Sequence, residues 1–368
     1  MSFMQNKIIY PWFKPSNKNK EILKNISKLV STNKMTMGNE VYKLEKRLEK
    51  KLNVKHVVLS TSGTSSLMMA TSALNVNYKT KVITTNLTWI ATINPALSTG
   101  ANIKVVDTYT NNQCVNFEKL IKEIKIFKPD ILYLVHLNGD VYYNLELDKL
   151  KKKMGFLIIE DAAQSFLVKQ KNLYCGTKYE IGCFSLSITK LINMIYGGFC
   201  TTNSTKLYNK LIAIRNNGVN AEPENSKMEI AKLNGFNFKP SNLHATIGLA
   251  YLKDSQQSIN KISNIYNLYK KKLSNHNKIS MIENYTKKAL PLYILVYVKN
   301  KKEFVNFCNQ SGIGLHFALR TINETKLISS KGEYPNSNFF SKNLIRLPCG
   351  PGYSLNEINK IINILNKY

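Results

Sequence analysis

Acidic residues are scarce in this sequence, which has 23 Asp and Glu against 52 Lys and Arg and a formal net charge of +29. Such a charge is typical of proteins that bind nucleic acid or an anionic surface. Arginine, which makes bidentate contacts to phosphates and bases, is also scarce, and it occurs only at Arg47, Arg215, Arg320 and Arg346. The lysines are scattered and accompanied by many Asn and Ile residues. We therefore interpret the charge as a compositional bias and keep nucleic-acid binding as an alternative.

The cysteines show no C-x-x-C spacing, and the sequence has no long apolar run. The six cysteines are Cys114, Cys175, Cys183, Cys200, Cys308 and Cys349. This spacing indicates neither a zinc site nor a disulfide framework, so free thiols in a reducing cytoplasm are expected. The N-terminal residues MSFMQNKIIYPWFK lack the apolar core of a signal peptide. The longest apolar run, residues 290–298, is too short to cross a bilayer, so the sequence predicts a cytoplasmic protein without a membrane span.

The chain has 368 residues, 43% of them hydrophobic, and this predicts a folded protein with two domains, a large one over 1–245 and a smaller one over 246–368. In the first part, short apolar runs alternate with helical stretches. The expected strands are 56–60, 82–85, 103–107, 131–136 and 156–161, and the expected helices are 65–74, 89–99, 117–127 and 147–153. This alternation predicts an α/β fold with a doubly wound, mostly parallel sheet. Ligands should bind at the carboxyl ends of its strands.

The pattern of expected helices and strands in the C-terminal part predicts a smaller α/β domain. Its expected helices are 260–273, 301–312 and 354–368, and its expected strands are 290–298 and 313–319. Residues 320–345 contain Gly332, Pro335 and several Asn and Ser residues, and they are expected to form a loop.

A small polar segment, Ser62-Gly63-Thr64-Ser65-Ser66, follows an expected strand and opens an expected helix. The free backbone N–H groups of a helix N-terminus, with hydroxyl groups beside them, bind anions. A glycine lets the backbone approach the anion closely. The structural alternative is an ordinary N-cap of small residues.

Two further candidates follow expected strands. Glu160 and Asp161 end an apolar strand, with Gln164 just beyond, and an aspartate at that edge can hold a cationic ring nitrogen. The alternative is a helix capping box formed by Asp161 and Gln164. Trp89 follows another strand, where its ring could stack on a planar ligand, and the alternative is core packing.

Lys190 ends the segment SLSITK (185–190) and lies among apolar residues ahead of Gly197-Gly198. A lysine in an apolar pocket has a lowered pKa, so its amine becomes a nucleophile that can form a Schiff base. The alternative is a lysine whose tip reaches the surface. Together these features supply what pyridoxal 5'-phosphate needs: an anion cradle, a lysine, an acid for the pyridine nitrogen and a flat group over the ring.

In their order along the chain, several segments resemble the motifs of the DegT–StrS family of sugar aminotransferases, which are pyridoxal-phosphate enzymes. The pair IIEDAAQS and GCFSLSITK is the most specific part of the resemblance. The other matching segments are TMGNEVYKLEKRL, STSGTSSL, TNLTWIATINPAL, VHLNG, IRNNG, GFNFKPSNLHATIGLAYL and RLPCGPGYS. The resemblance covers most of the chain.

The resemblance implies a role for each candidate residue. Lys190 would carry the cofactor in a Schiff base, and Asp161 would pair with its pyridine nitrogen. Gln164 would approach the 3-hydroxyl group, and Trp89 would stack on the ring. The phosphate-binding residues would be Thr64, Ser65, Ser185 and, from the neighbouring subunit, Asn237. The contribution from a second subunit implies a homodimer with shared active sites.

The implied fold is that of a fold-type I aminotransferase with a large doubly wound domain and a smaller C-terminal domain. The implied reaction moves an amino group, with glutamate as the expected donor, onto a nucleotide-linked keto-deoxy sugar in cell-surface glycan or related sugar biosynthesis. One branch of the family has histidine in place of the lysine and dehydrates its sugar, and Lys190 argues against that branch. A catalytically divergent member that still binds the cofactor stays an alternative.

The sequence departs from the family pattern in three places. The family's G-[DE]-G-G after the lysine is Ile195-Tyr196-Gly197-Gly198 here, so the acidic residue is lost. In the segment that begins at Asn237, the family's arginine is Lys239 and its glutamate is Asn242, and both changes touch the expected subunit interface. The family's Y-K-G-x-x-V-G hairpin is VKQKNLYCG here. The departures leave the cofactor-binding set intact and leave the substrate open.

Overall fold

The computed structural model describes residues 8–219, 231, 233–286, 289–317, 319–325, 327–328 and 332–368. Two short 3-10 helices span Ile90–Thr92 and Ile322–Glu324. The α-helices are α1 (Asn19–Ser31), α2 (Asn39–Leu52), α3 (Gly63–Ala73), α4 (Asn94–Ser98), α5 (Phe117–Phe127), α6 (Leu145–Met154), α7 (Thr205–Arg215), α8 (Asn242–Lys253), α9 (Ser255–Leu273), α10 (Lys301–Gln310), α11 (Pro335–Asn343) and α12 (Leu355–Leu365). The strands are β1 (His56–Ser60), β2 (Lys81–Thr85), β3 (Asn102–Val106), β4 (Ile131–Val135), β5 (Leu157–Asp161), β6 (Lys169–Gln170), β7 (Leu173–Tyr174), β8 (Ile181–Ser185), β9 (Gly198–Thr202), β10 (Ile279–Met281), β11 (Ile294–Val298), β12 (His316–Phe317) and β13 (Leu344–Leu347).

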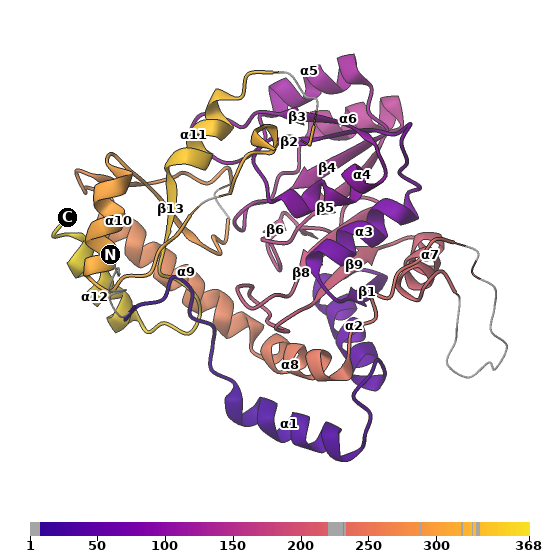
Figure 1. The fold of residues 1–368 in the computed structure, drawn as a ribbon, viewed down its shortest axis with the longest axis horizontal. Coiled ribbons are helices and arrows are strands. Elements are labelled where there is room, and N and C mark those ends of the chain that lie inside the picture. The colour runs from indigo at the N-terminus through magenta and orange to yellow at the C-terminus, as the bar shows by residue number, and fades with distance from the viewer. Residues whose placement is uncertain are drawn as a thin grey trace, which may run out of the picture.

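The large sheet has the strand order β1-β9-β8-β5-β4-β2-β3 (Figure 1). The neighbours from β8 to β3 pair in parallel, whereas β9 runs antiparallel to both β1 and β8. Both faces of this sheet are covered: on β4, Ile131 and Tyr133 join the apolar cluster that contains α3 side chains, while Leu132 and Leu134 join the cluster of α5 and α6. The predicted doubly wound, mostly parallel sheet is therefore confirmed.

A second sheet of four antiparallel strands, in the order β10-β11-β13-β12, forms the core of the C-terminal part. The chain before α1 also packs here, because Tyr10 bridges Ile313 and Phe13 bridges Cys349. Figure 1 shows α8 and α9 running one after the other from the side of the large sheet to the side of the small one. The boundary at residue 245 stays a prediction.

The large and small sheets are joined at Gly139, in the loop after β4. The φ angle of Gly139 is +77°, and a Cβ atom there would lie 1.6 Å from the carbonyl oxygen of Leu290. The backbone N–H of Leu290 donates to the carbonyl of Gly139 at 2.8 Å. Only glycine combines this φ angle with so close an approach of two backbones.

Three local predictions were wrong. Residues 89–99 form a 3-10 turn followed by the short helix α4, because Pro95 can begin a helix but cannot continue one. Of the strand expected at 313–319, only β12 pairs in the sheet. The expected loop at 320–345 contains α11, where Pro335 begins the helix, and the first residues of β13.

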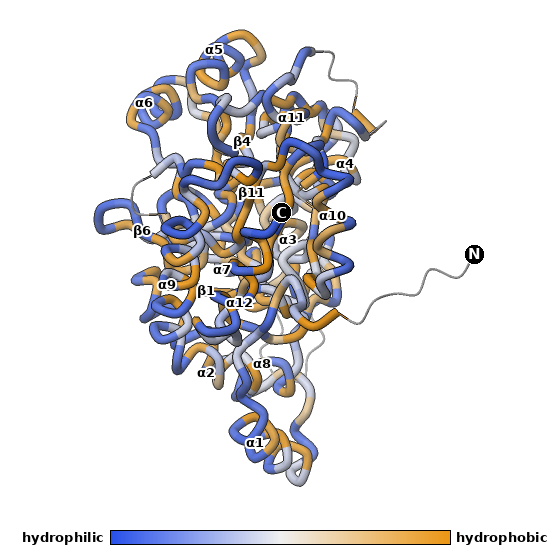
Figure 2. Tube along the Cα trace, turned by 90° about the vertical axis from the view of Figure 1, so that its left-hand side faces the viewer, coloured by the Kyte–Doolittle hydropathy of each residue, from blue (hydrophilic) through white to orange (hydrophobic). Residues whose placement is uncertain are grey.

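Hydrophilic and hydrophobic residues alternate along the outer helices α5 and α6, as Figure 2 shows. On α5 the buried side chains are Phe117, Leu120, Ile121 and Ile124, which is the spacing of one helix face. Among the described residues, no helix is long and apolar enough to span a membrane.

Candidate active site

Lys190 lies in a cleft between the large sheet and the small domain. From the large domain, the side chains of Gln164 and Ser185 line this cleft with it. From the other side, Ile262, Leu290 and Leu292 complete the wall. The structure thus brings together three predicted site residues, one from the loop after β5 and two from the end of β8 and the segment that follows it.

The amine of Lys190 points to a buried tyrosine that the sequence analysis did not identify. Its Nζ atom donates a hydrogen bond to the hydroxyl of Tyr293 at 3.2 Å. Burial raises the pKa of Tyr293, but the charges of Lys190 and Arg346 and two hydrogen bonds outweigh it, so the pKa lies below its ordinary value. Lys190 is half-buried, and its amine contacts the buried side chain of Tyr293. Its role as a nucleophile stays a prediction.

Asp161 is the last residue of β5, and it is only 6% exposed. Its carboxylate accepts hydrogen bonds from the hydroxyl of Thr92 at 2.7 Å and the backbone N–H of Ala163 at 3.2 Å. Burial raises the pKa of Asp161 above its ordinary value, although these hydrogen bonds and the charge of Lys190 oppose the shift. No helix begins in the described turn after Asp161, so the capping-box alternative is wrong.

Gln164 is held from the loop after β4. Its Oε1 atom accepts a hydrogen bond from the backbone N–H of Asn138 at 3.0 Å. The side chain of Asn138 in turn bonds the backbone of Tyr293, donating to its carbonyl at 3.0 Å and accepting from its N–H at 2.8 Å. Asn138 therefore fixes both Gln164 and Tyr293 relative to the sheet.

The N-terminus of α3 abuts the end of β8. Ser62 and Ser65 form a capping box, so the N-cap interpretation is confirmed, and it occupies the hydroxyl and the N–H of Ser65. The hydroxyl of Thr64 has no hydrogen-bond partner among the described residues. A Cβ atom on Gly63 would lie 2.8 Å from the Cβ of Ser185, so glycine is what allows this contact. Ser185 therefore packs closely against the N-terminus of the helix that carries Thr64.

Trp89 is 60% exposed, so the alternative of core packing is wrong. It stands at the start of a 3-10 turn whose Thr92 donates its N–H to the carbonyl of Trp89 at 3.0 Å. Since the Thr92 hydroxyl also bonds Asp161, the tryptophan segment is tied directly to the buried carboxylate.

Glu160, although adjacent to Asp161, has a different environment. It is fully buried and accepts hydrogen bonds from the Tyr143 hydroxyl at 2.7 Å, from His136 at 3.1 Å, and from backbone N–H groups of residues 176, 178 and 179. Burial raises the pKa of Glu160, but these hydrogen bonds outweigh it and the pKa lies below its ordinary value. Glu160 therefore organises the loop before β8, whereas Asp161 bonds Thr92 and Ala163 and feels the charge of Lys190.

Asn237 lies apart from this cleft. It forms an antiparallel bridge with Asn216, just after α7, and it is exposed. Within the described part of the chain, no hydrogen bond joins it to Lys190, Asp161 or Ser185. Its expected role from a neighbouring subunit stays a prediction.

The departures from the family pattern have local structural consequences. Ile195 has a φ angle of +65°, which is strained for a β-branched residue. The side chain of Tyr196 is 70% exposed. Asn242 caps α2: its Oδ1 atom accepts from the N–H groups of Glu40 at 3.1 Å and Val41 at 3.3 Å.

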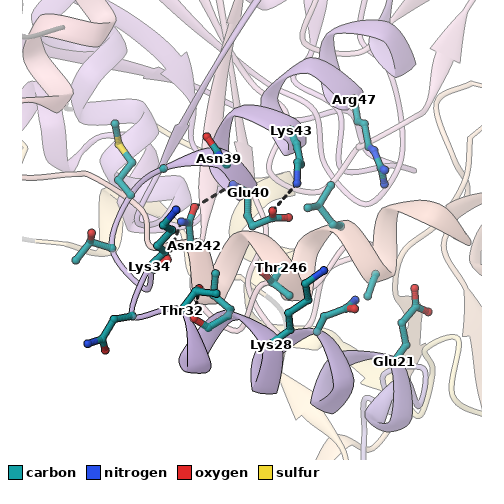
Figure 3. A pocket seen from close by; sticks show the side chains of 18 of the residues that line it. Glu21, Lys28, Thr32, Lys34, Asn39, Glu40, Lys43, Arg47, Asn242 and Thr246 are labelled. Atoms are coloured by element: carbon teal, nitrogen blue, oxygen red, sulfur yellow. Dashed lines mark hydrogen bonds and ion pairs between the residues drawn. The ribbon is translucent and has the colours of Figure 1, made fainter. Parts of the chain in front are cut away.

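Asn242 also lines a groove of about 940 Å³ between α1, α2 and α8 (Figure 3). Figure 3 shows Lys28, Lys43 and Glu40 projecting into it. The groove shares no lining residue with the Lys190 cleft. The two hollows are therefore separate features of the surface.

The mostly parallel sheet with a lysine-bearing cleft at its carboxyl edge defines the class of fold-type I aminotransferases. Residues 16–366 match the DegT/DnrJ/EryC1/StrS aminotransferase family, and the chain belongs to this family. The family and the fold class predicted from the sequence are thus confirmed, together with the expected class of enzyme and its cofactor, pyridoxal phosphate.

Relatives cover nearly the whole chain. The chain is 26% identical over 366 residues to GDP-perosamine synthase of Escherichia coli O157:H7, across 97% of this chain and 98% of that protein. It is also 26% identical over 345 residues to UDP-4-amino-4,6-dideoxy-N-acetyl-beta-L-altrosamine transaminase of Campylobacter jejuni, across 90% of both chains. Helicobacter pylori PseC, an aminotransferase of pseudaminic acid biosynthesis, superposes with a TM-score of 0.88 at 21% identity, across 97% of this chain and 98% of PseC. The Escherichia coli GDP-4-keto-6-deoxy-D-mannose-3-dehydratase with bound hydrated PLP superposes with a TM-score of 0.86 at 20% identity, across 98% of this chain and all of the dehydratase chain.

The residues present fit pyridoxal phosphate. Lys190 presents an amine inside the cleft, and Asp161 offers a buried carboxylate whose raised pKa a cationic ring nitrogen would lower. Thr64 and Ser185 stand at a helix N-terminus, the kind of site that binds phosphate.

Proposed function

We propose that this protein transfers an amino group from an amino acid, with glutamate as the expected donor, to a nucleotide-linked keto-deoxy sugar. The observation that carries the proposal is the position of Lys190 in one cleft with Gln164 and Ser185, electrostatically coupled to buried Asp161. Relatives named for GDP-linked and UDP-linked sugars support a nucleotide sugar as the acceptor. The product would serve cell-surface glycan or related sugar biosynthesis.

In this proposal each residue has one task. When bound, the cofactor draws electrons from the carbon that carries the transferred nitrogen. Lys190 would hold the cofactor until the donor amine replaces it, and its freed amine would then take a proton from the α-carbon of the donor. Asp161 would pair with the ring nitrogen and keep it protonated. Gln164 would approach the 3-hydroxyl group, and Trp89 would stack on the ring.

The phosphate is held by the helix N-terminus. We assign this task to the hydroxyls of Thr64 and Ser185 and the free N–H groups at the start of α3. Ser65 contributes by fixing the cap, because its own hydroxyl and N–H are already bonded to Ser62.

The first test is a visible absorption spectrum of the purified protein with added pyridoxal phosphate, before and after glutamate. We expect a band from the lysine-bound cofactor that disappears as the amine is transferred. Lys190→Ala and Lys190→Arg should both lack the band, because neither side chain offers a primary amine; Lys190→Arg is the matched control for charge. A band that persists in both variants would refute the assignment of Lys190, and a band that ignores every amino acid would refute transamination.

The homodimer with shared sites is tested by mixing two inactive variants. Lys190→Ala and Asn237→Ala are combined under conditions that exchange subunits. If Asn237 serves the neighbouring subunit, each mixed dimer contains one intact site and part of the activity returns. If both residues act within one chain, no mixed dimer has an intact site and activity stays absent.

A further inference from the structure

Tyr293 lies next to the small sheet, just before β11, yet the loop after β4 of the large sheet holds it in place. The side chain of Asn138 bonds both backbone groups of Tyr293, accepting from the N–H at 2.8 Å and donating to the carbonyl at 3.0 Å. Two residues further on, the carboxylate of Asp140 accepts from the backbone N–H of Thr286 at 3.0 Å. The tyrosine is therefore fixed relative to the strands that end at the Lys190 cleft.

The hydroxyl of Tyr293 offers Lys190 a hydrogen-bond acceptor in a fixed direction. Tyr293 is 2% exposed, and its ring packs against those of Trp12 and Phe13, with centroids 5.9 and 6.4 Å away. The hydroxyl donates its proton to the carbonyl of Thr189 at 3.4 Å, so its lone pairs are free to accept. The amine of Lys190 donates to this oxygen at 3.2 Å. The ring position and the proton direction are therefore both set by neighbours other than the lysine side chain.

The amine of Lys190 has one hydrogen-bond partner in the part of the chain that the structure describes. That partner is Tyr293, whereas Asp161 accepts its hydrogen bonds from two other groups. The backbone N–H of Lys190 donates to the carbonyl of Ser187 at 2.9 Å, so the base of the residue is also fixed. Beyond this base, the flexible four-carbon side chain gives the amine many rotamers unless a partner holds it.

We propose that Tyr293 is a positioning residue for the amino transfer, and that its hydroxyl holds the free amine of Lys190 within reach of the donor's α-carbon. This inference rests on the proposed function. In that reaction the amine must stay in the cleft after the donor has replaced it, and a fixed acceptor limits the rotamers that it samples. Tyr293 gains and loses no proton in this role. Since the described residues that line the cleft do not include Tyr293, its hydroxyl should affect the rate of proton transfer and not the binding of the donor.

The test removes the hydroxyl alone with Tyr293→Phe, which keeps the ring and its packing. The control is Tyr297→Phe, because Tyr297 lies in β11, is half-buried and packs against Phe339 with ring centroids 5.4 Å apart. The first half-reaction is followed by the loss of the lysine-dependent absorption band at several glutamate concentrations. This series separates the rate constant from the half-saturating concentration of glutamate.

A second measurement needs no cofactor. Urea unfolding of the cofactor-free protein is compared for wild type, Tyr293→Phe, Lys190→Met and the double variant, and this cycle isolates the contact between the two side chains. Met keeps the apolar stem of Lys190 and removes the amine. The bond from Tyr293 to the carbonyl of Thr189 is lost with and without the lysine, so its contribution cancels.

We expect Tyr293→Phe to lower the rate constant about 100-fold and to leave the half-saturating glutamate concentration unchanged, while Tyr297→Phe behaves as wild type. In the unfolding cycle, the hydroxyl should shift the equilibrium constant toward the folded state about 10-fold more when Lys190 is present. A wild-type rate in Tyr293→Phe, a loss only in the half-saturating concentration, or additive effects in the cycle would each overturn the proposal. Failure of the proposed function would show in the wild type, as a band that is absent or that ignores every amino acid, whatever the cycle reports.

Discussion

Replacing Asp161 by Asn tests separately what the buried carboxylate does for the stability of the protein and what it would do for binding of pyridoxal phosphate. In the protein without cofactor, the variant should fold with little change in stability. The hydroxyl of Thr92 can rotate to donate to Thr88, whose oxygen is 2.8 Å away, and then accept from the new amide. The amide oxygen can still accept from the N–H of Ala163. A hydrogen bond to a neutral amide is weaker than one to a carboxylate by about 1 kcal/mol. This loss is offset because the variant no longer buries a charged group, which is itself unfavourable.

The pH dependence has a definite sign. Burial raises the pKa of Asp161 in the folded protein above its unfolded value. The contribution of this group to stability is therefore complete below the unfolded pKa and is lost as the pH rises through the folded pKa. Asn has no such loss, so the stability of the variant relative to wild type should increase as the pH rises from the ordinary aspartate range to neutrality.

The affinity for pyridoxal phosphate should change in the opposite direction. Removing the carboxylate from a buried charged pair costs about 2 to 5 kcal/mol, which corresponds to at least about a 30-fold weaker Kd. The assays are thermal unfolding of the cofactor-free protein across pH and equilibrium titration with the cofactor. Asp107→Asn is the control, since Asp107 is also buried at a strand end but bonds Ser337 of α11. An Asp161→Asn protein that binds the cofactor as tightly as wild type would refute the reasoning.

Two further substitutions test the departures from the family pattern. Ile195→Gly should raise the free energy of unfolding by about 0.5 to 1 kcal/mol, because relief of the +65° φ angle exceeds the entropy that glycine adds to the unfolded chain. Exposed Ile188 has no such strain, so Ile188→Gly should destabilise, and equal effects of the two variants in urea unfolding would contradict this account. Asn242→Ala should cost about 1 to 2 kcal/mol, because it uncaps α2 and removes the hydrogen bond to the Lys34 carbonyl, whereas Asn242→Asp loses only that donated bond, keeps an accepting oxygen and should cost less. Identical unfolding midpoints for these two variants would show that the cap does not matter.

The local pattern of the sequence was enough to predict the large domain. Apolar runs set β1 to β5, and the helical spacing of apolar residues gave α5 its correct bounds. The carboxyl ends of these strands then predicted that Asp161 and Trp89 lie at one edge of the sheet, because parallel strands end together. These features depend on neighbours within about ten residues, so they can be read without knowledge of the fold.

The positions of proline predicted the starts and ends of helices less reliably. Pro335 was interpreted as part of a loop, but at the first position of a helix it fits without strain, and α11 begins there. The same residue type interrupts 89–99, where a continuous helix was expected. A proline can thus start a helix or stop one, and only packing against the rest of the chain selects between these outcomes.

Local signatures were enough to indicate the family, the order of the strands along the chain and the candidate residues Lys190 and Asp161. Which distant groups meet these residues depends on the folding of the whole chain. Tyr293 lies 103 positions from Lys190 in the chain, and the pairing of β13 with β11, which no local pattern encodes, brings Arg346 to the ring of Tyr293. The tertiary structure also decided that Glu160 and Asp161, adjacent and chemically alike, face different partners, since successive side chains of a strand point to opposite faces of the sheet.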